Sequence, residues 1–389
     1  MNLPNTISNI PREVFVTYIV EKLRKENPHL LACFDESNFV MGGAVVHVPN
    51  AGASPDTQKN RSSFPAVAVM RGDSHVTYAL DVYSTDPTHI TWHEGAEISY
   101  DKTDSVLNDH MQTLIEAVGD NMLYNWVVGL HLSGGSYVTD TIPSTNVIFT
   151  TGDWTAVNPD DGQEGVRRSL LYAELQKAQA MMNKAGVPKT NRFAMIESYM
   201  HQQLIESLSA NQMAAYQKAA DLAKGIVGEF AGFKIMERGS VLAFNEAGST
   251  PIVPGVAIDD SDNIACLCWQ KDQVTKAQGD IMPFDDKGNP LYYGDVFSSL
   301  VKFGGRVRRA DWKGIIAIVQ TSVDTTELDA LIVTAEALVE ITYTTATWAT
   351  FAAALAAALA VAENAAHTTA TVADAVVSLQ AAIDQLVEA

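Results

Sequence analysis

Residues that turn a chain or charge it positively are missing from one end of this sequence. Every proline, glycine, lysine and arginine lies at or before Gly314, and the 75 residues that follow contain none of the four. Ser322 to Ala389 holds nine acidic residues and no lysine or arginine. Because composition changes this sharply where folded units meet, we predict two units, 1–321 and 322–389, joined by the polar link TSVDTT.

Basic residues are outnumbered in the whole chain, with 26 lysines and arginines against 46 aspartates and glutamates and a net charge of -20. A protein that binds duplex nucleic acid neutralises phosphates with clustered Lys and Arg side chains, which this acidic chain does not supply. Sequence-specific nucleic-acid binding is therefore not expected.

Cysteines and targeting segments are also scarce. Three cysteines, Cys33, Cys266 and Cys268, are too few for a disulfide scaffold, and their odd number suits a reducing compartment. The first residues, MNLPNTISNIPREVF, have neither the basic start nor the apolar core of a signal peptide. Ile341 to Ala362 is uncharged and long enough to cross a bilayer, but it consists mostly of Ala and Thr and has acids at both ends. A membrane-spanning helix is not expected.

Two groups of possible metal ligands do not have the spacing that a site needs. His89, His93 and Glu94 lie in HITWHE, whose alternating pattern predicts a strand, and residues four apart on a strand are about 13 Å apart. We expect solvated or interfacial histidines there. Cys266 and Cys268 cannot close a tetrahedral site by themselves and are predicted to be buried small side chains.

Other ligand-binding and catalytic motifs are incomplete. The loop AIDDSDNIA lacks the glycine and the distant glutamate of a calcium loop, so a solvated turn is expected at Asp259, Asp260, Asp262 and Asn263. The glycines of GIVGEFAGF lack the spacing of a phosphate loop. No catalytic, cofactor or metal site is expected, and the chain is not expected to be an enzyme.

The first hundred residues predict a helix followed by strands. Pro11 to Glu26 has the pattern of a helix within an N-terminal arm, 1–34. Over 35–100 the apolar period changes to two, which predicts strands at VVHV, FPAVAVM and HVTYALDVYS, the last with one apolar face made of Val76, Tyr78, Leu80 and Val82. The polar, turn-rich stretch PNAGASPDTQKNRSSF is predicted to be the tip of a long exposed hairpin.

A long amphipathic helix is predicted from Asp101 to Leu130, and it would measure roughly 45 Å. One stripe of this helix is expected to be structural core: Leu107, Met111, Leu114, Val118 and Met122. From 131 to 321 short strands and helices alternate, beginning with a helix from about Gly165 to Lys184, which is typical of an α+β or mixed α/β body.

The tail contains three further apolar stripes at helical spacing, joined by the short links ITYTT and ENAAHTT, which favour antiparallel neighbours. A three-helix bundle is therefore predicted. Its stripes are Leu328, Leu331, Ile332, Ala335 and Leu338; Trp348, Phe351, Leu355, Leu359 and Ala362; and Val372, Val376, Leu379, Ile383 and Leu386.

The order of these elements resembles the major capsid proteins of tailed bacteriophages, the Hong Kong 97-type fold. FVMGGAVVHVPNAG is similar to the strand that enters the family's extended loop, and ITWHEGAEISYDKTDSVLNDHMQTLIEAVGDNMLYNWV to its peripheral strand and spine helix. VPKTNRFAMIES resembles the first strand of the axial domain, and the segment from NIACLCWQ to IIAIVQ resembles the closing part. The resemblance covers roughly Thr6 to Thr321.

The tail resembles a different family, the FIVAR module, a three-helix unit appended to many bacterial surface proteins. The resemblance rests on YT, TW, the alanine-leucine middle helix and the closing AIDQLV. Unlike the usual pattern, this tail has no lysine or arginine.

The capsid resemblance implies a structural subunit that assembles into an icosahedral shell around double-stranded phage DNA. It implies hexamers and pentamers of the chain itself, with portal, scaffold and decoration proteins as further partners. It also implies assembly in the host bacterial cytoplasm and a final place in the virion. We expect contacts between subunits at Asp56, Lys59 and Arg61 in the hairpin tip. An encapsulin-like bacterial shell and a surface adhesin or glycan-binding protein remain alternatives.

Overall fold

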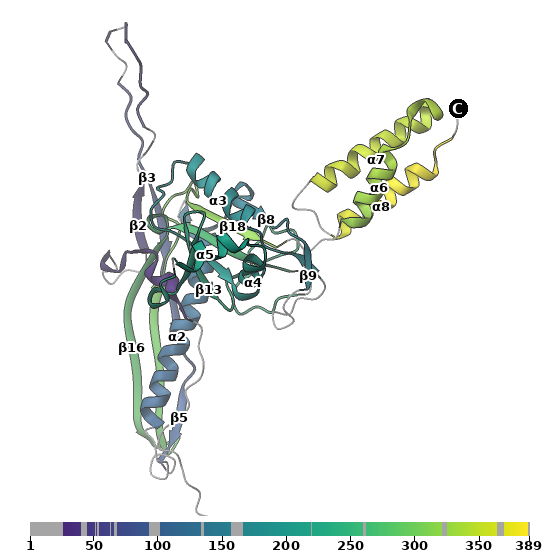
Figure 1. Cartoon of the computed structure of the whole chain (residues 1–389). Helices are drawn as coiled ribbons and strands as arrows, with labels where there is room; N and C mark the ends of the chain where they lie inside the picture. The colour runs from purple at the N-terminus through teal and green to yellow at the C-terminus, as the bar shows by residue number, and fades with distance from the viewer. Residues whose placement is uncertain are drawn as a thin grey trace, which may run out of the picture. The chain divides into compact units, whose positions relative to one another are not determined.

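The computed structural model describes residues 26–39, 45–50, 52, 54–62, 64–65, 68–92, 102–133, 136–156, 166–218, 220–259, 262–320, 325–363 and 369–387 (Figure 1). The helix predicted over Pro11 to Glu26 lies outside these residues except for its last one. Contacts group the described residues into two compact units. The first contains Asp81–Val118 and Gln278–Phe303, and the second contains Asn27–Leu80, Gly119–Ala277 and the residues from Gly304 onward.

The second unit is built on a mixed sheet with the strand order β12-β13-β11-β15-β18-β8, to which β14 is added by pairing with β15. Every residue of β11, β15 and β18 is buried. Strands covered on both faces have continuous apolar runs, as IIAIV in β18 does, and not an alternation. The strands are β8 (Val147–Phe149), β11 (Arg192–Glu197), β12 (Ile226–Phe230), β13 (Phe233–Arg238), β14 (Leu242–Phe244), β15 (Asn263–Gln270) and β18 (Ile315–Val319).

Three helices pack their apolar side chains into one core with this sheet: α3 (Tyr172–Lys184), α4 (Ser198–Glu206) and α5 (Ala210–Lys218). Glu197 ends β11 and caps α4, because its carboxylate accepts hydrogen bonds from the backbone N–H groups of Tyr199 and Met200. The predicted start of α3 at Gly165 was wrong. Residues Val166–Arg168 form strand β10, which pairs with β9 (Trp154–Ala156), and the helix starts after them.

A hairpin of β2 (Val45–Asn50) and β3 (Ser74–Ala79) precedes this body. The strand predicted at FPAVAVM is not formed in its described residues, since Ala68 to Met70 are irregular and Pro65 has no N–H to donate to a ladder. The predicted strand HVTYALDVYS is divided: β3 pairs with β2, and β4 (Asp81–Ser84) pairs with β17. Tyr78 and Leu80 are buried as expected, but Val82 is exposed because the strands before and after Leu80 belong to different sheets.

The long helix, α2, spans Lys102–Val127. The prediction extended it to Leu130, but the chain enters β6 (Val128–Ser133), which pairs with β7 (Ser136–Thr141). The carbonyl of Val127 accepts a hydrogen bond from Ile142 N–H at 2.8 Å, so sheet bonding replaces the next helical turn. Helix-disfavouring Val128 and Gly129 follow at this point.

A second sheet contains two long strands, β16 (Thr275–Asn289) and β17 (Gly294–Gly304). Its order is β1-β16-β17-β4, with β5 (Thr88–Thr91) also paired to β17 and β1 (Phe34–Asp35) parallel to the start of β16. Short 3-10 helices occupy Pro28–Leu31, Ser37–Phe39, Ser144–Asn146, Leu222–Lys224, Lys271–Gln273 and Glu340–Thr342.

The tail forms the three helices expected from its stripes, α6 (Thr326–Glu336), α7 (Thr345–Glu363) and α8 (Thr369–Asp384), which pack on one another (Figure 1). All fifteen residues of the three predicted stripes belong to the bundle's apolar cluster, with Leu328, Phe351 and Leu379 fully buried. By length and composition, Thr345–Ala362 in α7 could cross a membrane. Phe351 and Ala358 of that segment are buried between the helices of the bundle, and 11% of the segment is buried in all.

Candidate functional site

The loop between β2 and β3, residues 51–73 (here the hairpin loop), is exposed wherever its side chains are described, apart from half-buried Gly52. The predicted contact residues Asp56, Lys59 and Arg61 lie in it, and within the described part of the chain they form no ion pair or hydrogen bond. The structure therefore places these residues on an open surface but gives them no partner.

Apolar side chains on the same loop were missed by sequence reasoning. Phe64, Val69 and Met70 are 79%, 86% and 94% exposed. The segment FPAVAVM that contains them was interpreted as a strand, which would have covered one of its faces. Single exposed apolar residues are common, but several of them on one loop make it a candidate surface for contact with another molecule.

A second exposed apolar group lies in the first unit, at the turn between β16 and β17. Leu291 and Tyr293 in this turn are 82% and 81% exposed, and Trp92, next to the end of β5, is 74% exposed. Trp92 N–H donates to Tyr293 O at 3.1 Å, which joins the two segments. We call these three residues the turn patch.

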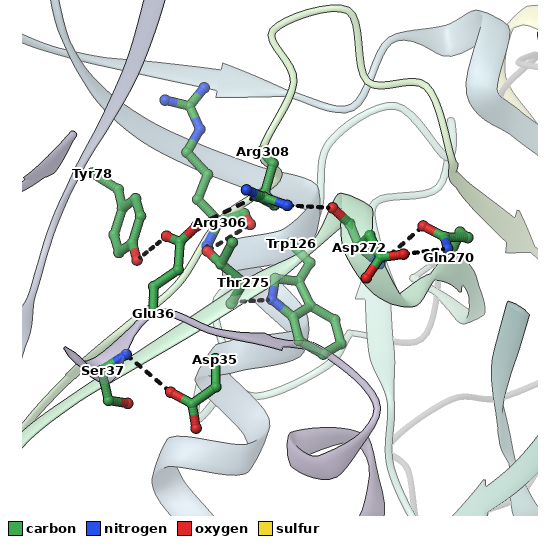
Figure 2. Close-up of polar contacts among 10 residues, drawn as sticks. All are labelled: Asp35, Glu36, Ser37, Tyr78, Trp126, Gln270, Asp272, Thr275, Arg306 and Arg308. Carbon is green, nitrogen blue, oxygen red and sulfur yellow. Dashed lines mark hydrogen bonds and ion pairs between the residues drawn. The ribbon is translucent and has the colours of Figure 1, made fainter. Parts of the chain in front are cut away.

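The base of the hairpin is fixed by a buried carboxylate, Glu36 (Figure 2). The Tyr78 hydroxyl, from β3, donates a hydrogen bond of 2.8 Å to Glu36 Oε2. Arg308, beyond the end of β17, places its Nε 3.4 Å from Glu36 Oε1. The Glu36 side chain therefore connects strand β3 of the hairpin to the segment that follows β17.

Backbone hydrogen bonds support this anchor from β16 and the residues before it. Glu36 N–H donates to Lys276 O at 2.8 Å, and Arg308 N–H donates to Gln273 O at 2.8 Å. The Arg308 guanidinium lies 4.3 Å from the centre of the Phe34 ring and donates to Asp272 O at 3.2 Å. Figure 2 also shows Trp126 of α2 pointing at β16, where its Nε1 donates to Thr275 O at 3.0 Å.

Electrostatics at the anchor are dominated by burial. Burial raises the pKa of Glu36, while the Tyr78 hydrogen bond and the Arg308 charge act in the opposite direction. Burial and the Glu36 carboxylate also raise the pKa of Tyr78, so the phenol stays protonated and remains a donor. A buried carboxylate with one donor and one cation is suited to structural anchoring.

The residues predicted as helix core lie on α2. Leu114, Val118 and Met122 are buried, and Leu107 and Met111 are half-buried nearer the start of the helix. The stripe is therefore covered most completely towards its C-terminal half.

The two groups of possible metal ligands considered from the sequence do not form a site among the described residues. No cluster of three or more potential ligands exists there. His89 lies in β5, whereas His93 and Glu94 lie outside the described residues. Cys266 and Cys268 are free and buried in β15 as predicted. Burial raises the pKa of both thiols, to about 12 for Cys268, so they are inert at neutral pH.

The acidic loop closes as a turn in its described part. Asp259 N–H donates to the Asp262 carboxylate at 2.8 Å, and Asp262 N–H donates to Asp259 O at 3.0 Å. Asn263 is buried at the start of β15, and Asp260 lies outside the described residues. Gly225 and Gly232 have positive φ angles of 68° and 70° in turns, which gives them a conformational role.

No protein-family model and no curated protein matches the sequence. Solved structures do match. The cyanophage Pam1 capsid chain matches with a TM-score of 0.56 and 9% identity over 83% of this chain and 99% of the other. The Ralstonia phage GP4 capsid chain matches with a TM-score of 0.54 and 12% identity over 83% of this chain and 99% of the other. The cyanophage P-SCSP1u capsid chain matches with a TM-score of 0.54 and 16% identity over 79% of this chain and 92% of the other.

The chain has the phage capsid fold. The expected Hong Kong 97-type α+β architecture is thereby confirmed, with the spine helix at α2. At identities of 9% to 16%, the likeness to these capsid chains lies in the arrangement of elements. The match to a FIVAR module stays a prediction.

Proposed function

We propose that this chain is the major capsid protein of a tailed phage, a structural subunit that assembles with copies of itself into an icosahedral shell around double-stranded DNA. The observation that carries the proposal is the fold match to capsid chains, which spans 99% of the Pam1 and GP4 chains and not merely one motif of them. The proposed role requires contacts between subunits and not a reactive pocket, because a shell subunit tiles a surface.

The exposed apolar residues support self-assembly. A hairpin loop with Phe64, Val69 and Met70 in water, and a turn patch with Trp92 and Tyr293, leave apolar area uncovered. In a shell of identical subunits, neighbours cover these surfaces. Asp56, Lys59 and Arg61 then add charged contacts at the rim of the loop's interface, where they favour correct pairing more than affinity.

The tail, 322–389, is proposed to be a separable module displayed on the outer surface. The bundle has its own apolar core, and capsid chains cover 83% of this chain, close to the share that residues 1–321 make up. Nine acids without a lysine or arginine would be repelled by packed DNA inside a shell, whereas water surrounds them outside. The FIVAR-like pattern agrees with a surface role.

Further elements of the proposal follow from a capsid role. Hexamers and pentamers of the chain close the shell in the host bacterial cytoplasm, with portal, scaffold and decoration proteins as partners. The subunit needs neither membrane nor cofactor. The acidic surface contains DNA without reading its sequence.

Electron microscopy of the purified chain tests this proposal. Expression of residues 1–389 is expected to produce closed icosahedral particles, and particles from infected cells should contain DNA. A chain that stays monomeric over a wide concentration range, with or without co-expressed phage proteins, would contradict the capsid role. Particles filled with a protein cargo and no DNA would favour the encapsulin-like alternative.

A further inference from the structure

Helix α3 and the loop after it present lysines and no exposed acid, in a chain whose net charge is -20. Over 166–205 the only acids are Glu174 and Glu197, and both are buried. We call the exposed residues of 173–189 the α3 face: Ala173, Gln176, Lys177, Ala180, Asn183, Lys184, Ala185, Gly186, Pro188 and Lys189.

The two buried acids are used within the fold. Glu174 Oε1 accepts hydrogen bonds from Thr151 N–H at 2.9 Å and from Thr151 Oγ1 at 2.7 Å, and its Oε2 accepts from Leu171 N–H at 2.9 Å. Glu197 caps α4. Neither carboxylate therefore offsets a lysine on the α3 face.

The polar side chains of the α3 face have no partner within the described ranges. Lys177, Lys184 and Lys189 form no ion pair or side-chain hydrogen bond there. The side-chain amides of Gln176 and Asn183 form no hydrogen bond there either. Three positive charges and two amide groups are therefore available to another molecule.

The segments that contact α3 do not supply the missing acids. Strand β8 has no charged residue. The hairpin of β12 and β13 packs Phe230 on Tyr172, and its acid Glu229 lies opposite Lys234 in register. One exposed acid, Asp153, lies in the loop that contacts the first turn of the helix, whereas the lysines begin in the middle of the helix. The face is therefore locally positive.

The spacing of the lysines suits a polymer of phosphates. Lys177 and Lys184 are seven residues apart, close to two helical turns, so they lie on the same side of α3 about 10 Å apart along its axis. Duplex DNA carries about one negative charge per 1.7 Å of its axis, so about six phosphates fall within this length. Lysine is a flexible point charge, and amide side chains can also donate to phosphate oxygens.

The composition of the α3 face favours a duplex over other partners. The face has no aromatic residue, and its apolar side chains are alanines and Pro188. Protein interfaces depend on a few large anchors such as Trp, Tyr and Arg, and single-stranded nucleic acid is bound by stacking on aromatic rings. Contact with a duplex backbone needs only positive charge and hydrogen-bond donors.

We propose that the α3 face binds the phosphate backbone of duplex DNA without sequence preference, and that in the shell it contacts the packaged genome. The acidic remainder of the chain does not prevent this contact, because at 0.1 M ionic strength charges farther away than about 10 Å are largely screened. Only the contact with the genome rests on the proposed function. Binding of a duplex by the free subunit does not.

Fluorescence anisotropy of a short labelled duplex, titrated with unassembled full-length subunits at several salt concentrations, tests the face. We expect binding at low salt that weakens as salt rises. Each of Lys177→Gln, Lys184→Gln and Lys189→Gln should reduce the slope of log K against log salt by about 1. The triple Gln variant should lose binding at least tenfold, and the triple Arg variant, which keeps the charges, should bind as the parent does.

The matched control removes three lysines from exposed sites elsewhere: Lys59→Gln, Lys287→Gln and Lys302→Gln. It changes the net charge equally and should bind as the parent does. Circular dichroism verifies the fold of each variant. No binding by the parent at low salt, or equal losses in the two triple Gln variants, would overturn the proposal. Tighter binding of poly-glutamate or single-stranded DNA than of the duplex would overturn it as well.

Reductive methylation of lysines in DNA-filled and empty particles tests the contact with the genome. Lys177, Lys184 and Lys189 should be labelled less in filled particles, and Lys287 equally in both. Equal labelling of the three lysines would overturn the genome contact. If the chain forms no particles the capsid role fails, and the duplex titration still decides whether the α3 face binds DNA.

Discussion

Strand β15 and the hairpin loop both carry apolar residues, but only the strand has them covered by its own chain. All eight residues of β15 are buried. On the loop, Phe64, Val69 and Met70 are each at least 79% exposed. The difference teaches that folding of one subunit completes the central sheet and leaves the loop without its contacts. The proposed shell role needs this division, because in that role the remaining contacts come from neighbouring subunits.

The largest effect on the subunit should come from placing a charge in the covered stripe of α2. Leu114 is 4% exposed, so Leu114→Asp buries a carboxylate without a partner and is expected to cost several kcal/mol, enough to unfold a marginal domain. Ile115, the next residue along the helix, is 43% exposed, and Ile115→Asp is the matched control. Thermal unfolding should separate the two variants clearly. A Leu114→Asp subunit as stable as the control would show that the stripe faces water.

A smaller effect is expected at the hairpin anchor. Tyr78→Phe removes the hydroxyl that donates to buried Glu36, and should reduce the free energy of unfolding by about 1–3 kcal/mol. Tyr83→Phe removes a hydroxyl for which no hydrogen bond is found within the described residues, and serves as the control. Chemical denaturation of assembly-deficient subunits measures both. Equal losses in the two variants would mean that Glu36 does not anchor the hairpin.

The loss in free energy of unfolding caused by Tyr78→Phe should also depend on pH. Burial already raises the folded-state pKa of Glu36 above its ordinary value of 4.5, and loss of the Tyr78 donor raises it further. Well below pH 4.5 the carboxyl group is protonated in both the folded and the unfolded state, so the part of the stability loss that comes from ionisation disappears. As pH rises through the folded pKa, the variant must bury the charge with one donor fewer. The loss of stability should therefore grow as the pH rises from well below 4.5 through the raised folded-state pKa of Glu36, and a loss that shrinks over this range would contradict this account.

Sequence reasoning succeeded where one local pattern determines one element. The apolar run of β18, the stripe of α2 and the three stripes of the tail were located from spacing alone. It failed where the pairing of strands distant in the sequence determines whether a residue is buried or where an element ends. Val82 is exposed because β4 pairs with β17, more than two hundred residues later in the chain. The α2 end was misplaced because the β6 and β7 pairing is not a helical signal.

The candidate surfaces were predicted only in part. The charged tip of the hairpin was expected to be exposed, and Asp56, Lys59 and Arg61 are so. Phe64 and Met70 were not recognised, because alternating apolar residues predict a strand whether or not a partner strand exists in the same chain. Glu36, Tyr78 and Arg308 come from three distant segments and share no motif, so only the fold brings them together.

Substitutions in the hairpin loop should affect assembly and leave the subunit itself almost unchanged. Replacing Phe64, Val69 and Met70 together by Ser removes little intramolecular packing, so the unfolding free energy should change by less than about 0.5 kcal/mol per site. Shell formation, measured by sedimentation, should be lost or strongly weakened. The charge reversal Lys59→Glu with Arg61→Glu should weaken it less. Particles of normal yield and heat resistance from both variants would remove the loop from the interface.

The smallest effect is expected from deletion of the tail. A stop after Thr321 removes a bundle with its own core, so particles of normal size should form without surface projections. Electron microscopy of the truncated and full-length particles provides the comparison. Failure of the truncated chain to assemble, or inaccessibility of the tail to a specific antibody on intact particles, would show that the bundle is part of the shell.

Hydrogen exchange of the free subunit and of the assembled particle tests the division between sheet and loop most directly. We predict that backbone amides in the hairpin loop exchange quickly in the subunit and become protected in the particle, and that the amides of β15 are protected equally in both. Particles in which residues 54–62 and 68–73 exchange as fast as in the free subunit would contradict the claim that neighbouring subunits complete the contacts of this loop.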